Sequence, residues 1–148
     1  MASRYQIIRQ CLIDGLRRSN YDVSKFQPAL PSGGLFSNRL ELDLAHRSAR
    51  SIAGGLKMSI QKGEKYNRDE LEKEIDIQSA ISAYEGATGA MLIYMASGKN
   101  VTKYVQEARE ALEILRKHKY VALKFMEERL KKLVGEILLK TQQTWYRN

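Results

Sequence analysis

Residues 39–62 hold the side chains whose types and spacing best suit a chemical task, namely binding phosphate groups. On a helix, the basic side chains of this segment lie on or beside one face: Arg39, His46, Arg47, Arg50 and Lys57. Small residues, including Gly54 and Gly55, leave little bulk next to that face. Arginine and serine side chains donate hydrogen bonds to phosphate oxygens, and small neighbours let a nucleic-acid backbone approach closely. The pattern predicts phosphate contacts that do not read base sequence.

The same segment carries an apolar seam about a quarter of a turn away from the basic face. Its members recur at a spacing of three or four: Leu42, Ala45, Ala49, Ile52, Leu56 and Ile60. The pair Gly54 and Gly55 lowers helix stability by up to ~2 kcal/mol relative to two alanines, so we expect a compensating contact. A second interpretation stays open, in which the small residues allow close packing between helices and the arginines are solvated.

Motifs that would indicate an enzyme, a metal site or a cofactor are weak. His46 and His118 are the only histidines, and Cys11 is the only cysteine. Neither type lies in a cluster with metal-ligand spacing. The sequence SGKN (97–100) departs from a phosphate-binding loop because Asn100 replaces the serine or threonine and Ile93 replaces the first glycine. We therefore expect a protein that is not an enzyme and needs no metal or cofactor, with Cys11 as a small core residue.

The net charge of +8 over 148 residues is distributed unevenly. Residues 1–62 hold ten Lys or Arg and four Asp or Glu, residues 63–113 hold six and ten, and residues 114–148 hold nine and three. Two basic segments thus flank an acidic one. This distribution is typical of proteins that bind a polyanion such as nucleic acid, an acidic membrane or an acidic partner.

Membrane insertion and secretion are not expected. The first ten residues, MASRYQIIRQ, carry charges where a signal peptide has an apolar run. The most apolar stretch, residues 86–98, is too short to span a bilayer. We expect a cytoplasmic protein, unless it resides in a virion.

The elements that position these side chains are predicted to be helices. Apolar spacing indicates helices over residues 3–19, 37–61 and 68–97, the last with Gly98 as its C-terminal cap. Residues 20–36, with two prolines and Gly33-Gly34, indicate an extended arm. A further helix begins at Asn100 or Thr102. The predicted fold is all-α, a bundle of about four helices (37–148) preceded by a basic N-terminal helix and arm (1–36).

Residues 101–145 pose the question of one helix or two. The apolar stripe of Val101, Val105, Ala108, Leu112 and Leu115 resumes after RKHK (116–119) at Ala122, Met126, Leu130, Leu133 and Ile137. One helix of this length would measure about 67 Å at 1.5 Å per residue, which is long for a compact domain. We predict a break near residues 117–120.

The C-terminal segment also contains a basic run: Arg116, Lys117, Lys119, Lys124, Arg129, Lys131 and Lys132. Glu127, Glu128 and Glu136 are interspersed with it, and Lys124 and Glu128 have the four-residue spacing of an ordinary surface pair. We interpret this run as a solvated helix face.

The basic N-terminal helix (Arg4, Arg9, Arg17, Arg18), the Pro/Gly arm at 28–34 and the basic small-residue helix at 37–62 together resemble the major capsid proteins of filamentous archaeal viruses. The resemblance covers the whole chain as a pattern and no diagnostic motif supports it. It implies dimers that polymerise around double-stranded DNA in A-form, phosphate contacts without base reading, and a virion (nucleocapsid) location. The acidic segment 64–76 would then face away from DNA.

The contacts expected from the residues and this resemblance are Arg4, Arg9, Arg17, Arg18, Arg39, Arg47, Arg50 and Lys57. Each would neutralise a phosphate. The expected partners are nucleic acid, with double-stranded DNA favoured, and a second copy or homologous subunit. Two alternatives remain. The chain also resembles the small helical subunits of multi-subunit CRISPR effector complexes, which line a nucleic-acid groove. It could instead be a helical adaptor that binds protein.

Overall fold

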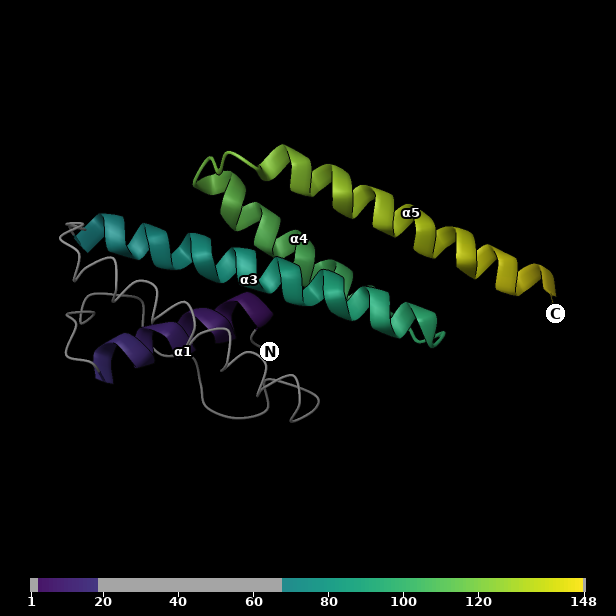
Figure 1. Ribbon diagram of the computed structural model, residues 1–148, viewed down its shortest axis with the longest axis horizontal. Coiled ribbons are helices and arrows are strands. Elements are labelled where there is room, and N and C mark those ends of the chain that lie inside the picture. Colours follow the sequence, from purple (N-terminus) through teal and green to yellow (C-terminus); the bar gives the residue numbers. More distant parts are fainter. Residues whose placement is uncertain (1–2, 19–67, 148) are drawn as a thin grey trace. The chain divides into compact units, whose positions relative to one another are not determined.

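The computed structural model describes residues 3–18 and 68–147, and every regular element within these two stretches is an α-helix (Figure 1). The helices are α1 (Arg4–Arg18), α3 (Arg68–Ala96), α4 (Thr102–Lys117) and α5 (Leu123–Arg147). The prediction of an all-α helical bundle is confirmed. The predicted arm (20–36), the predicted helix over 37–61 and the predicted domain boundary after residue 36 lie outside the described residues.

The chain divides into two compact units, one of residues 1–83 and one of residues 84–148. Unit 1 contains α1 and the first part of α3, and unit 2 contains the remainder of α3 together with α4 and α5.

In unit 1, α1 begins with a reciprocal hydrogen-bonded cap. The Ser3 hydroxyl accepts from the Gln6 backbone N–H at 3.2 Å, and the Gln6 side chain accepts from the Ser3 N–H at 2.9 Å. Serine and a glutamine three residues later satisfy two N–H groups that a helix start leaves unpaired. The predicted helix over 3–19 is confirmed within one residue at each end, and its whole predicted stripe is buried: Tyr5, Ile8, Leu12 and Leu16.

The helix predicted over 68–97 is α3, and most of its predicted stripe is buried. Ile81 and Met95 are only half-buried. Instead, three alanines that the pattern did not indicate are completely buried: Ala80, Ala83 and Ala87. A small residue allows close packing against α3. The spacing of large apolar residues alone therefore does not predict that this face is buried.

Gly98 ends α3 as predicted, with φ at 72°. Its N–H donates to the Met95 carbonyl at 3.0 Å, and the Lys99 N–H donates to the Tyr94 carbonyl at 3.0 Å. These two bonds make a Schellman motif, which needs a left-handed residue at this position. The Asn100 side chain then accepts a hydrogen bond from the N–H of Thr102, the first residue of α4, at 2.9 Å. Stacked rings of Tyr94 and Tyr104, 5.4 Å apart, join the two helices beside the turn.

The predicted break near 117–120 is confirmed, so residues 101–145 form two helices. The end of α4 repeats the Schellman motif. The Lys119 N–H donates to the Arg116 carbonyl and the Tyr120 N–H donates to the Leu115 carbonyl, both at 3.0 Å. Here a lysine, Lys119 with φ at 53°, takes the left-handed position that Gly98 takes in the other turn.

Unit 2 is held by its apolar interior and by a buried hydrogen bond between α3 and α5. Helices α4 and α5 contact each other, and the interior of the unit is lined by apolar side chains that include Met91, Leu115, Met126 and Leu130. The buried Tyr84 hydroxyl donates to the Met126 backbone carbonyl at 3.0 Å. This bond attaches the first turn of α5 to α3.

Candidate nucleic-acid interface

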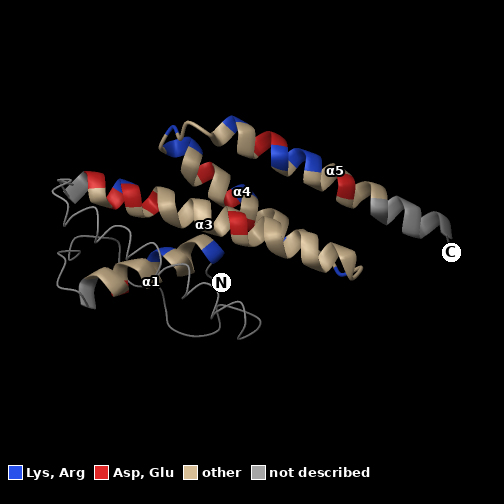
Figure 2. Ribbon diagram, in the orientation of Figure 1, with Lys and Arg blue, Asp and Glu red and all other residues tan. Residues whose placement is uncertain are grey.

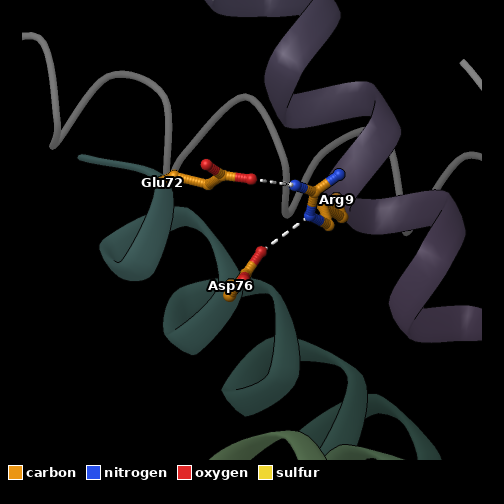
Figure 3. A network of polar contacts seen from close by, with 3 residues as sticks. All are labelled: Arg9, Glu72 and Asp76. Atoms are coloured by element: carbon orange, nitrogen blue, oxygen red, sulfur yellow. Dashed lines mark hydrogen bonds and ion pairs between the residues drawn. The ribbon is translucent and has the colours of Figure 1, made fainter. Parts of the chain in front are cut away.

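Arg9, one of the predicted phosphate contacts, is held in an ion-pair network within unit 1 (Figure 3). Its Nε donates to Asp76 Oδ1 at 2.7 Å, and a terminal nitrogen donates to Glu72 Oε1 at 3.4 Å. The two acids lie four residues apart and so face the same side of α3. The Arg9 side chain is only 12% exposed. Its guanidinium therefore links α1 to α3 and is not presented to a partner.

The other predicted contacts divide into two groups. Arg4 is 5% exposed, so it too belongs to the interior of unit 1. The side chains of Arg17 and Arg18 lie outside the described part of the structure, as do the entire residues Arg39, Arg47, Arg50 and Lys57.

Cys11, which was expected in the core, is half-buried and forms no disulfide.

Exposed basic residues in the described part of the chain gather instead at the α4–α5 turn and along α5, as Figure 2 shows in blue. Seven lie there: Arg116, Lys117, Lys119, Lys124, Arg129, Lys131 and Lys132. Lys73, Lys99, Lys103 and Arg109 are also exposed, at separate places on α3, α4 and the turn between them. In the first half of α3, by contrast, most of the charged residues are acidic (Figure 2). The C-terminal basic run is exposed to solvent, as predicted. It is also the largest group of exposed basic residues in the described part of the chain, so a polyanion could reach it.

Arg116 is the one member of this set that is fixed by carboxylates. It forms ion pairs with Glu113 on its own helix and with Glu127 on α5, the latter at 3.1 Å. The side-chain hydrogen bonds to Glu113 and Glu127 raise its pKa, so the group is charged at any ordinary pH. The side chains of Arg116, Glu113 and Glu127 are all partly exposed to solvent, and exposed ion pairs contribute little to stability. We therefore expect these pairs to orient the α4–α5 turn more than to stabilise it.

Lys124 and Lys131 form the most regular part of the basic surface. They lie seven residues apart, hence on one face of α5 and about 10 Å apart along its axis. Neither is in an ion pair with a described residue, including Glu128, the surface partner that the four-residue spacing suggested for Lys124. Arg129 lies on a different side of α5, close enough to Tyr84 to affect its ionisation. Lys124 and Lys131 therefore present two charges on one side of α5, and neither forms an ion pair within the described part of the chain.

Other chemistries find no support within residues 3–18 and 68–147. This part of the chain has no group of three or more His, Cys, Asp or Glu side chains that could hold a metal ion. None of the described helices combines the length and apolar character needed to cross a membrane.

No protein-family model, curated protein or solved structure matches this chain.

Proposed function

We propose that this chain is a structural nucleic-acid-binding protein, a capsid or nucleocapsid subunit that polymerises around double-stranded DNA. The observation that carries the proposal is the exposed pair Lys124 and Lys131 on α5, which has no carboxylate partner in the described part of the chain. Lysine ammonium groups act as point charges that neutralise phosphates, and they do so without reading bases.

The basic face predicted on the helix over 37–61 is a second, separate candidate for phosphate contacts. Arg39, Arg47, Arg50 and Lys57 keep their predicted role there, as do Arg17 and Arg18 on α1. Arg4 and Arg9 do not, because burial and carboxylates already account for their charge. Lys124 and Lys131 of unit 2 and the basic residues predicted before residue 62 are therefore two separate sets of proposed phosphate contacts.

Electron microscopy of the purified protein with linear double-stranded DNA at low salt tests this function. We expect regular filaments whose length follows the length of the DNA. Replacing Lys124 and Lys131 together with alanine should prevent or shorten them. The matched control is the double variant Lys73→Ala/Lys99→Ala, which removes the same charge from exposed positions on other elements and should leave the filaments intact.

A protein-binding adaptor is the second candidate, and the exposed apolar side chains on α5 favour it, with Phe125 at 69% and Leu138 at 59% exposure. An adaptor would show no affinity for DNA at low salt. A subunit of an effector complex would bind an RNA–DNA hybrid as discrete particles and would form no filament. These outcomes separate the three functions in one set of binding reactions.

A further inference from the structure

A line of exposed residues follows α5 directly beside Lys124 and Lys131. Its members recur every three or four residues: Val121, in the turn just before α5, and Phe125, Glu128, Lys132, Gly135 and Leu139 within the helix. All six are exposed, and the three large apolar side chains are among the most exposed of their kind, with Val121 at 95%, Phe125 at 69% and Leu139 at 60%. This alternating spacing is that of the a and d positions at which two helices pack together. We call these six residues the α5 seam.

Gly135 is the member of the seam that unit 2 itself does not explain. It lies inside α5, its backbone is not in the left-handed region, and a Cβ atom built on it would meet nothing within 4 Å. Neither a turn nor a close neighbour among the described residues requires a glycine here. A glycine inside an exposed helix reduces helix stability. Space for a bulky side chain from another molecule would account for its presence.

We propose that the α5 seam pairs antiparallel with the α5 seam of a second copy of this chain. If Phe125 packs on Gly135 of the second copy, the same register brings Lys132 to Glu128 of the second copy. It also brings Leu139 to the end of α5 of the second copy that follows Val121. Each contact occurs twice because of the two-fold symmetry. Each pair of facing residues forms one layer of the helix pair. The three kinds of layer match a large residue with a small one, a cation with an anion and an apolar residue with an apolar one.

Charge determines the direction of this pairing. A parallel pair in register would put Glu128 opposite Glu128 and Lys132 opposite Lys132, and like charges at such positions are unfavourable. The antiparallel register converts all four charges into two ion pairs. A seam that complements itself in both size and charge identifies a second copy of the same chain as its occupant.

The pairing goes beyond nucleic-acid binding and does not require it. It would nevertheless enlarge the basic surface, because the two-fold axis brings Lys124 and Lys131 of both copies to the same side of the helix pair. Their mutual repulsion, together with the glycine in two of the layers, makes the isolated dimer weak. A polyanion bound along the shared side would relieve that repulsion.

Directed disulfide formation tests the register. In the full chain with Cys11→Ser, we would prepare Phe125→Cys and Gly135→Cys as separate single variants, without nucleic acid. Oxidation of the two mixed together should give a covalent dimer that contains one copy of each. Either variant oxidised alone should stay uncoupled, because its own cysteines would lie about 15 Å apart along the helix pair, beyond the reach of a disulfide. Self-coupling of Phe125→Cys would indicate a parallel pair and overturn the proposal, as would an uncoupled mixture.

Sedimentation equilibrium of the full chain tests the energetics. Glu128→Lys and Lys132→Glu should each raise the dimer Kd at least tenfold, and the double variant should restore it to within threefold of the original value. Gly135→Leu should also raise the Kd at least tenfold while the helix content measured by circular dichroism does not fall, which separates lost pairing from lost folding. Dimerisation unaffected by all of these changes would overturn the proposal. Since no nucleic acid is present, a failure of the DNA-binding function leaves these results unchanged.

Discussion

Helices α1 and α5 are both rich in basic residues, yet they use their charge differently. Arg9 of α1 is 12% exposed and is neutralised by Glu72 and Asp76, so its charge holds unit 1 together. Lys124 and Lys131 of α5 are exposed and have no carboxylate partner in the described part of the chain. The difference teaches that a basic segment is evidence for a polyanion partner only after the charges used inside the fold have been subtracted.

The largest effect should come from breaking the Arg9 network. Arg9→Ala removes the guanidinium that two partly buried carboxylates of α3 contact, and we expect it to lower the free energy of unfolding by about 2 kcal/mol. Urea unfolding followed by circular dichroism measures this. Lys73→Ala, at an exposed position on the same part of α3, is the control and should change stability by less than about 0.5 kcal/mol. A loss for Arg9→Ala no larger than that of the control would show that the network is not structural.

Gly98→Ala tests whether unit 2 depends on its turns and not on its surface charges. A Cβ at Gly98 would meet nothing within 4 Å, so the cost is confined to the left-handed backbone at φ 72°. We expect a destabilisation of about 1 kcal/mol, measured as a lower urea midpoint. No measurable change would mean that the turn adjusts without its glycine.

Tyr84→Phe should remove the hydrogen bond that holds the first turn of α5 and cost about 1 kcal/mol at neutral pH. Burial raises the pKa of Tyr84 above 10.0, and the nearby charge of Arg129 offsets part of that rise. Because the folded chain favours the protonated phenol, this contribution is complete below pH 10 and is lost as the pH rises through the folded-state pKa. Thermal unfolding between pH 8 and pH 11 should show a steeper alkaline loss for the original chain than for Tyr84→Phe. Equal slopes would contradict the assignment.

The smallest effect should come from Lys119→Gly, which has the opposite sign to Gly98→Ala. Lysine at φ 53° is strained, and glycine is not, although glycine also gains freedom in the unfolded chain. We expect a net stabilisation of about 0.5 kcal/mol, seen as a small rise in the urea midpoint. A destabilisation would show that the lysine side chain contributes to the turn.

The sequence predicted the helices well, because apolar spacing is a local signal. It located α1, α3 and the start of α4 within a residue or two, and it predicted the end of α3 from Gly98. The break after α4 was predicted from length alone, since Lys119 gives no local sign that it adopts a left-handed backbone. The buried Ala80, Ala83 and Ala87 were missed because alanine is also common on exposed helix faces.

The candidate site was predicted less well, because the fate of a charge depends on distant residues. Arg9 and Asp76 are 67 positions apart in the chain, and nothing near Arg9 indicates that pairing. The spacing of Glu72 and Asp76 on one face of α3 was an available signal for a basic partner, but not for which one. For α5, the Glu residues between the lysines suggested neutralised surface pairs, whereas Lys124 forms no ion pair with Glu128.

The salt dependence of binding to double-stranded DNA tests the central claim most directly, by comparing three variants with the original chain. Lys124→Ala/Lys131→Ala should reduce the slope of log K against log salt concentration by roughly two units, equally for unrelated DNA sequences. Arg50→Ala/Lys57→Ala should also reduce this slope by roughly two units if the predicted helix over 37–61 contacts DNA. Arg9→Ala, measured where it remains folded, should leave the slope unchanged. The opposite result, a lower slope for Arg9→Ala and an unchanged one for the α5 double variant, would contradict the division of roles between α1 and α5.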